Sequence, residues 1–285
     1  MLPIELYEAG IENAWCPGCG NFGMLKAFKR ALAELEIRPE EFLMVSGIGQ
    51  SGKFPHYLKC NTFNGIHGRT LPVATGARLA NPGLQVVAEA GDGDCYGEGG
   101  NHLLAAIRRN PKILLVVHNN QIYALTKGQA SPTTDLGYKT LLQPEGVAYP
   151  PLHALALAVS QDCSWVGRGF AGEVQHLADL YKQALNHPGF ALLEVLQPCV
   201  TFNHVNTYKW YSERVYRVEE EPGYDPENEL WAYQKAKEWG DRIPIGVIYR
   251  HVRPLLEYIH PALAAGPLVR QTPERPIKEL LADFF

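Results

Sequence analysis

The chain has 285 residues, of which 46% are apolar and 20% are charged, and its formal net charge is −4. This composition is typical of a globular protein with a sizeable core, and a mildly acidic chain has no positive field that would hold a nucleic acid. The apolar runs fall far short of the roughly 20 residues that a membrane-spanning helix needs. No basic stretch followed by an apolar one stands near the N-terminus, so we expect a cytoplasmic protein.

Predicted helices and strands alternate along residues 1–204, which we interpret as one domain. A helix is expected over 21–37, where Leu25, Phe28 and Leu32 recur at helical spacing. Runs rich in branched and aromatic residues predict strands at 42–45, 84–90, 113–117 and 190–196. Two more helices are expected, at 151–160 and 173–187. The alternation predicts an α/β fold with a mostly parallel sheet and helices on both faces.

Residues 205–285 differ from the domain before them. They are rich in Tyr and Trp, and the stretch 219–229 is strongly acidic. We interpret them as a C-terminal extension that packs its aromatic side chains on the domain or on a partner subunit.

Each predicted strand is followed by a loop rich in Gly, Asn, Asp or Cys. In chain order these loops are SGIGQSGK, GDGDCYGEGG, HNNQIYALTKGQ and QPCVTFN. Ligands bind at the carboxyl ends of the strands in open α/β sheets. The four loops are therefore expected to meet at one edge of the sheet and to form the active site.

Two of these loops contain groups that suit a diphosphate and a magnesium ion. Gly91 and Gly93 would let the backbone approach a pyrophosphate, because neither carries a Cβ. Asp92 and the side-chain oxygen of Asn120 are hard oxygen ligands that suit Mg²⁺, and the carbonyl of Ile122 is a natural third ligand.

Two other phosphate motifs are incomplete. Residues 47–53 fit the start of a P-loop, but Phe54 stands where a hydroxyl must hold magnesium. The GDGDCYG segment is similar to a dinucleotide fingerprint, but Tyr96 occupies the position of its third glycine. A nucleoside triphosphate or nicotinamide site is therefore disfavoured.

The six cysteines are too few and too unevenly spaced for a disulfide scaffold. Cys16 and Cys19 form a CPGC half-site of the kind that binds zinc or an iron–sulfur cluster. A redox disulfide at this CxxC is less favoured, because such pairs normally follow a strand and none is predicted before Trp15.

Two further sulfur ligands must come from the other four cysteines. Cys199 follows a predicted strand and lies in a loop of the expected active edge, so it is the best candidate. Cys60 lies in the connection after the first strand and could fold back to the same edge. Cys95 and Cys163 are expected to pack in the interior.

Seven segments at matching spacing together resemble the thiamine-diphosphate-binding β subunit of the 2-oxoacid:ferredoxin oxidoreductases. They are WCPGCGNFG, VSGIGQSGK, FNGIHGRTLPVATGARLANP, AEAGDGDCYGEGGNH, AIRRN, HNNQIYALTKGQASPT and PCVTFNHVNTYKWY, within about residues 12–212. The resemblance implies a thiamine-diphosphate-binding fold in which the GDG segment and Asn120 hold the magnesium diphosphate. It also implies that four cysteines hold one 4Fe–4S cluster near the cofactor.

The resemblance implies an activity as well. A 2-oxoacid would be decarboxylated oxidatively with coenzyme A to acyl-CoA and carbon dioxide, and electrons would pass through the cluster to ferredoxin. The LTKGQ form of one loop favours 2-oxoglutarate as the substrate. The alternatives are a thiamine-dependent decarboxylase without redox chemistry, and a zinc-stabilised interaction subunit without activity.

The resemblance also proposes roles for particular residues. His67, Arg69 and Lys127 are the candidate catalytic residues, and Lys127 could pair with the distal carboxylate of 2-oxoglutarate or with an anionic group of coenzyme A. The residues expected to contact the cofactor are Ile48, Gly49, His67, Gly91, Asp92, Gly93, Asp94, Asn120, Ile122, Leu125 and Thr126.

Two features depart from the family's pattern or are missing from this chain. Many members carry a cysteine directly after the GIG segment as a cluster ligand, and here that residue is Gln50. Because an amide is a poor ligand for iron held by thiolates, we assign the role to Cys60. No glutamate lies in a segment where it could activate the thiamine ring. The resemblance places that glutamate on a partner α subunit, so the chain alone is expected to be inactive.

Overall fold

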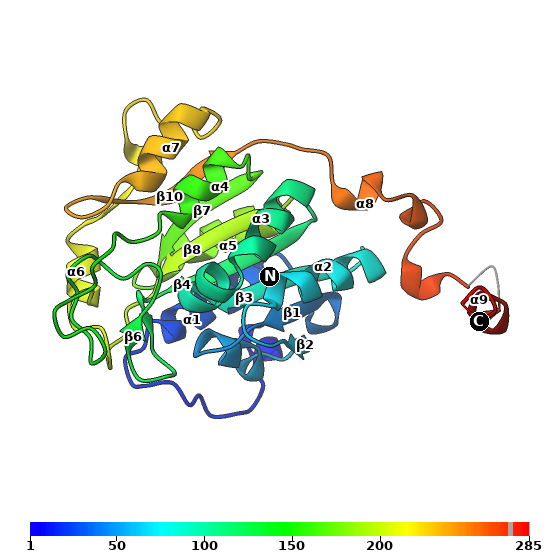
Figure 1. Cartoon of the computed structure of the whole chain (residues 1–285), viewed down its shortest axis with the longest axis horizontal. Helices are drawn as coiled ribbons and strands as arrows, with labels where there is room; N and C mark the ends of the chain where they lie inside the picture. The colour runs from blue at the N-terminus through cyan, green and yellow to red at the C-terminus, as the bar shows by residue number, and fades with distance from the viewer. Residues whose placement is uncertain (273–275, 285) are drawn as a thin grey trace.

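An eight-stranded sheet forms the centre of the molecule (Figure 1). The structure is a computed structural model that describes residues 1–272 and 276–284. The strand order is β2-β1-β3-β4-β8-β7-β10-β9. The strands are β1 (Phe42–Ser46), β2 (Asn61–Asn64), β3 (Gln85–Gly91), β4 (Ile113–Asn119), β7 (Trp165–Phe170), β8 (Ala191–Leu196), β9 (Val215–Arg217) and β10 (Ile243–Arg250). The first six strands along the sheet are parallel and β10 runs antiparallel to β7, which confirms the predicted α/β fold with a mostly parallel sheet.

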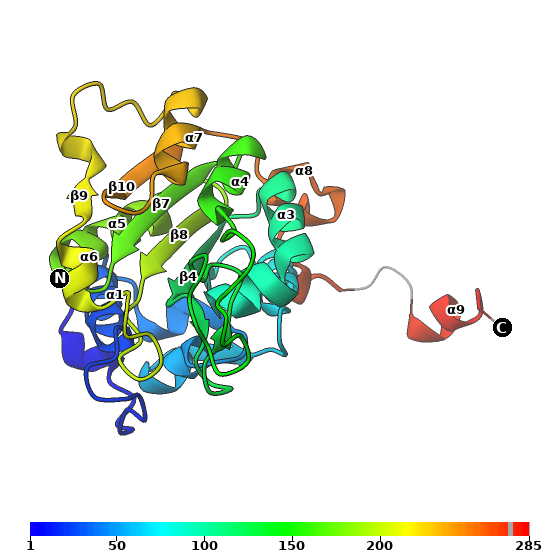
Figure 2. The same ribbon diagram turned by 60° about the vertical axis from the view of Figure 1, so that its left-hand side comes forward.

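Helices cover both faces of this sheet (Figures 1 and 2). On one face α1 (Asn21–Glu34) packs beside α5 (Val174–Asn186). The other face is covered by α2 (Thr70–Ala80), α3 (Gly100–Arg109), α4 (Ala154–Ser160) and α7 (Glu229–Lys237).

Alternating side chains of each strand fill two separate cores. Phe42 and Met44 of β1 point into the core under α1 and α5, whereas Val45 points into the other core. In β4 all seven residues are buried, which is typical of a parallel strand covered on both sides. Among the described residues, no helix is both long enough and apolar enough to cross a membrane.

The residues after 204 continue the same sheet. They form α6 (Tyr208–Ser212), β9, α7, β10, α8 (Leu256–Ile259) and α9 (Ile277–Leu281). The aromatic residues of the segment pack onto the domain: Tyr211 is fully buried and donates to Gln121 Oε1 at 2.8 Å, and Trp239 lies against the Arg168 guanidinium. In both views α9 lies apart from the sheet (Figures 1 and 2).

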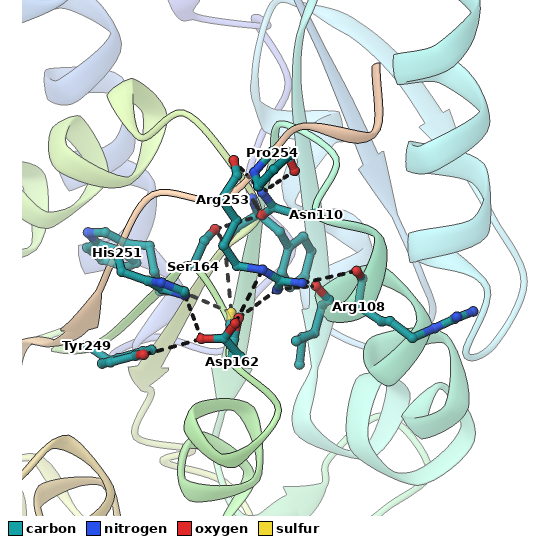
Figure 3. Close-up of polar contacts among 12 residues, drawn as sticks. Arg108, Asn110, Asp162, Ser164, Tyr249, His251, Arg253 and Pro254 are labelled. Atoms are coloured by element: carbon teal, nitrogen blue, oxygen red, sulfur yellow. Dashed lines mark hydrogen bonds and ion pairs between the residues drawn. The ribbon is translucent and has the colours of Figure 1, made fainter. Parts of the chain in front are cut away.

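Figure 3 shows how the segment after β10 is fastened to the body. Asn110, at the end of α3, has a left-handed backbone with φ of +54°, and its Nδ2 donates to the carbonyls of Arg253 and Pro254 at 3.2 and 3.1 Å. His251 Nε2 lies 2.7 Å from a carboxylate oxygen of Asp162. Arg253 also lies 3.5 Å from that carboxylate.

Candidate cofactor site and cysteine pocket

The loops after β1, β3 and β4 enclose a cavity of about 510 Å³ at the carboxyl edge of the sheet. All eleven residues expected to contact the cofactor line this cavity: Ile48, Gly49, His67, Gly91, Asp92, Gly93, Asp94, Asn120, Ile122, Leu125 and Thr126. Gln197, directly after β8, completes the wall. The structure therefore brings together loops that are up to about 150 residues apart in the chain.

Asp92 is buried at the carboxyl end of β3. Its Oδ2 accepts hydrogen bonds from the hydroxyls of Ser131 and Thr133, at 2.5 and 2.6 Å. Both bonds stabilise the charged carboxylate, but burial outweighs them and raises the pKa of Asp92 to about 6. A buried carboxylate whose hydrogen bonds do not compensate for its burial gains from a nearby cation, so the residue suits Mg²⁺.

Asn120 is held by a neighbouring amide. Its Nδ2 donates to Gln197 Oε1 at 3.1 Å, and its Oδ1 accepts from the backbone N–H of Ile122 at 3.1 Å. The first bond fixes which end of the amide carries the oxygen, and an amide oxygen has a second lone pair for a cation.

Gly93 packs under an aromatic ring. A Cβ at this position would lie 2.2 Å from the ring of Tyr123, whose hydroxyl donates to the Gly93 carbonyl at 3.2 Å. Glycine is therefore required here by Tyr123, in addition to any phosphate that approaches the backbone.

Asp94 connects three loops. Its Oδ1 accepts from the backbone N–H groups of Gly68 and Ile48, at 2.8 and 3.3 Å, and its Oδ2 accepts from Thr70 Oγ1 at 3.3 Å. A Cβ on Gly47 would collide with this carboxylate. His67 Nδ1 lies 3.5 Å from Asp94 Oδ1, and its side chain is 38% exposed at the mouth of the cavity. Asp94 therefore holds the loops together, and His67 is the neighbour that can reach a ligand.

Arg69 and Lys127 are not among the residues that line the cavity. Both are exposed, and Arg69 caps the start of α2. Lys127 has a positive φ of +82° and directly follows Leu125 and Thr126, which do line the cavity. Lys127 therefore stands at the rim of the cofactor cavity, next to two residues of its wall.

Of the described residues, those that line the cavity include two carboxylates, Asp92 and Asp94, and no glutamate. The nearest glutamate along the chain, Glu89, does not line the cavity, and its Oε2 is 2.5 Å from Nε2 of His118, which does. Burial raises the pKa of Glu89. Because Glu89 does not line the cavity, it is not placed to contact a cofactor there.

A second cavity, of about 360 Å³, lies beside the first and shares Gln50, Asn120, Ala124 and Gln197 with it. We call it the cysteine pocket, because Cys16, Cys19 and Cys199 line it. The N–H of Gly20 donates to the carbonyl of Pro198 at 3.2 Å and joins the CPGC loop to the loop after β8. Gln197 Nε2 donates to Cys19 Sγ at 3.3 Å. Three of the four cysteines predicted as ligands are thus brought together.

Cys60 is not among the residues that line the cysteine pocket. It stands directly before β2, and the next residue, Asn61, pairs with Leu43 near the start of β1. The strands run three residues further, about 10 Å, from that level to the carboxyl edge. Because β2 runs parallel to β1, the residue before β2 lies at the amino edge of the sheet, whereas the cysteine pocket lies at the carboxyl edge. This position does not support the predicted role of Cys60 as a ligand.

Known proteins match the chain over most of its length. Residues 47–195 match the family model for the thiamine pyrophosphate enzyme, C-terminal TPP binding domain. Residues 199–265 match the model for the C-terminal part of the pyruvate ferredoxin oxidoreductase beta subunit. The 2-oxoacid:ferredoxin oxidoreductase subunit beta of Saccharolobus solfataricus is 44% identical over 250 residues, 84% of this chain and 82% of that one. The chain belongs to this family of β subunits.

Two more similar proteins agree with the assignment. Subunit beta of 2-oxoacid:ferredoxin oxidoreductase 1 from Aeropyrum pernix is 43% identical over 92% of this chain and 84% of that one. A solved structure of 2-oxoglutarate:ferredoxin oxidoreductase from Magnetococcus marinus, with 2-oxoglutarate, coenzyme A and succinyl-CoA bound, superposes with a TM-score of 0.89 at 33% identity. It covers 99% of this chain and 95% of that one.

The residues present fit the family's thiamine cofactor well and an iron–sulfur cluster only in part. The buried carboxylate of Asp92 is suited to the magnesium diphosphate. Among the described residues, no three His, Cys, Asp or Glu side chains converge on one point that could hold a single metal ion. An iron–sulfur cluster does not need such convergence, because each cysteine binds a different iron. The cysteine pocket of this β subunit offers three thiols, and Gln50 also lines it.

Several residues of the site were not found from the sequence. Ser131 and Thr133 hold Asp92, Tyr123 covers Gly93, and Gln197 bonds both Asn120 and Cys19. Gln197 directly follows a predicted strand, so the rule that placed Cys199 at this edge could also have found it.

Proposed function

We propose that this chain is the β subunit of an enzyme that decarboxylates 2-oxoglutarate oxidatively with coenzyme A, to succinyl-CoA and carbon dioxide, and passes the electrons to ferredoxin. The choice of 2-oxoglutarate as the substrate rests on the likeness to the Magnetococcus marinus enzyme. That enzyme binds 2-oxoglutarate, coenzyme A and succinyl-CoA, and its structure covers 99% of this chain. The lysine at the rim, Lys127, supplies a positive charge for a dicarboxylate.

The residues of this chain hold and orient the cofactor in the proposed site. Thiamine diphosphate, when bound, supplies the electron sink for loss of carbon dioxide from the 2-oxoacid. Asp92, Asn120 and the carbonyl of Ile122 would hold its magnesium ion, and Gly91 and Gly93 would lie against the diphosphate. Asp94 keeps the Ile48 and Gly68 loops in place, so that His67, which lines the cavity, would face a bound ligand.

The cysteine pocket supports a redox reaction rather than a simple decarboxylation. An iron–sulfur cluster bound there would accept one electron at a time. The pocket shares a wall with the cofactor cavity through Gln50, Asn120, Ala124 and Gln197. Electrons would therefore have only a short path from the cofactor to the cluster, and from there to ferredoxin.

The proposed site is completed by a second chain. Thiamine activation needs a carboxylate beside the aminopyrimidine ring, and the described residues place only Asp92 and Asp94 in the cavity wall as carboxylates, each already engaged. We therefore assign the activating glutamate to a partner α subunit.

The test is an assay of the complex of this chain with its α subunit, prepared without oxygen. Pyruvate, 2-oxoglutarate and a branched 2-oxoacid are compared for coenzyme A-dependent reduction of ferredoxin. We expect the highest kcat/KM with 2-oxoglutarate. A complex that releases carbon dioxide without reducing ferredoxin is a non-oxidative decarboxylase, and a complex without either reaction that contains zinc is an interaction module; both outcomes contradict the proposal.

A further inference from the structure

The cysteine pocket contains a buried polar atom without a partner. Oε1 of Gln50 is buried, and it has no hydrogen bond to any part of the chain that the structure describes. The backbone of Gln50 is fixed, because its carbonyl accepts from Trp15 Nε1 at 3.0 Å. Trp15 in turn packs edge-on against Tyr57. Buried carbonyl oxygens are nearly always bonded, so an orphaned one in a pocket wall points to a missing ligand.

The three thiols that line the pocket together with Gln50 are held by the fold. A Cβ on Gly20 would lie 2.9 Å from the side chain of Gln197, so the CPGC loop lies tightly against the residue that follows β8. The N–H of Cys19 donates to the carbonyl of Cys16 at 2.9 Å and closes the turn between them. Cys199 lies two residues after Gln197 in the same wall.

We propose that the iron–sulfur cluster of this chain is held by three thiolates, those of Cys16, Cys19 and Cys199, and that Gln50 stands at the fourth corner, where the iron is exchangeable. This inference rests on the proposed function, in which the pocket holds such a cluster. A neutral amide oxygen is a far weaker ligand for iron than a thiolate. The iron at that corner is therefore the first to leave.

Loss of that iron is an oxidation with a simple balance. A [4Fe–4S]²⁺ cluster that releases Fe²⁺ and gives one electron to an oxidant such as ferricyanide becomes [3Fe–4S]⁺, and all four sulfides are kept. Addition of Fe²⁺ and a reductant reverses the step. A cluster with three thiolates also carries one negative charge fewer than a cluster with four, which raises its reduction potential.

The test uses the full-length chain in complex with its α subunit, reconstituted anaerobically with iron and sulfide. After treatment with ferricyanide and desalting, iron and acid-labile sulfide are measured and the EPR spectrum is recorded. We expect the wild-type protein to lose about a quarter of its iron, to keep its sulfide, and to show the signal of an oxidised three-iron cluster. Fe²⁺ with dithionite should restore the iron.

Two variants test whether the exchangeable iron is the one at Gln50. Gln50→Cys supplies a fourth thiolate, so it should keep all of its iron under the same treatment. Cys60→Ser should behave like the wild type, because Cys60 does not line the pocket. Loss of the cluster in Cys60→Ser, or equal loss of iron by Gln50→Cys and the wild type, overturns the inference.

The wild-type measurement is decisive even if the variants fail to fold. A wild-type cluster that keeps four irons in ferricyanide overturns this inference and leaves the proposed function standing. A wild-type protein that takes up no iron and sulfide at all overturns both.

Discussion

Asp92 and Asp94 stand two residues apart, yet their surroundings give them different tasks. Asp92 accepts from the hydroxyls of Ser131 and Thr133, and its burial favours a cation. Asp94 instead accepts from two backbone N–H groups on two other loops. Both line the cavity, as the sequence predicted, but the second task of Asp94 could not be predicted, because hydrogen bonds to backbone donors far along the chain leave no trace in the sequence.

That the residues expected to contact the cofactor line one cavity could be predicted, because one rule places them. Ile48, Asp92 and Asn120 each follow a recognisable strand, and the carboxyl ends of parallel strands meet at one edge. The same rule was not enough for the cluster ligands. Cys60 precedes its strand, β2, whose four exposed polar and aromatic residues were not recognised as a strand. Once β2 is known to run parallel to β1, Cys60 must lie at the opposite end.

Lys127 is expected to set substrate preference. Lys127→Ala should raise the KM for 2-oxoglutarate about tenfold and change that for pyruvate much less, because only 2-oxoglutarate has a second carboxylate to pair with. Alanine is chosen over glycine, since glycine would also relax the backbone at a φ of +82°. Steady-state kinetics of the complex with both substrates measure the effect.

An exposed lysine outside the rim provides the control. Lys139→Ala should leave both KM values unchanged, because Lys139 is solvent-exposed and does not line the cavity. Equal increases of KM for 2-oxoglutarate and pyruvate in Lys127→Ala would show that this lysine does not contact the distal carboxylate.

At the scale of elements, β7 is a strand that the sequence did not predict, and it contains two glycines. β7 has the sequence WVGRGF, and its glycines are needed: a Cβ at Gly167 would lie 2.5 Å from the ring of Trp165, and one at Gly169 would lie 2.7 Å from Leu177. Glycine weakens the local strand signal, and here tertiary packing outweighs it. β10 was also missed, because it belongs to a segment that was interpreted as an extension and lies antiparallel beside β7.

Arg253 fastens the segment after β10 to the end of α3. Its guanidinium donates to the carbonyls of Ile107, Arg108 and Asp162, at 3.0, 3.2 and 2.6 Å (Figure 3). Arg253→Ala should lower the free energy of unfolding by about 1–3 kcal/mol and speed proteolysis of residues 251–272, because these carbonyls lose their donor. Urea denaturation and limited proteolysis would measure both effects.

Arg250 is the matched control for this variant. It lies on the last position of β10, is more than half exposed, and reaches Glu227 only at 3.9 Å. Arg250→Ala should change stability by less than about 0.5 kcal/mol. If the two variants were equally stable and equally resistant to proteolysis, the bonds in Figure 3 would not hold the segment.

At the scale of the whole molecule, the sheet carries two cavities with a common wall. Its parallel part brings the loops after β1, β3, β4 and β8 to one edge, and the CPGC loop before α1 reaches the same edge through the Gly20–Pro198 bond. The cofactor cavity and the cysteine pocket therefore touch through Gln50 and Asn120. Cofactor and electron acceptor can thus be placed side by side by one chain, but the cavity wall has no free carboxylate for proton transfer among the described residues.

We therefore expect the chain to be inactive when it is purified alone. Proton transfer by a positioned group contributes about 10²–10⁴-fold to a rate, so 2-oxoglutarate-dependent reduction of ferredoxin should fall at least about a hundredfold without the α subunit. Addition of separately purified α subunit should restore it. A complex that contains Asp92→Asn should assemble by gel filtration and remain inactive, since the amide cannot neutralise magnesium. Activity of the isolated chain within a few fold of that of the complex would mean that the activating carboxylate lies on this chain.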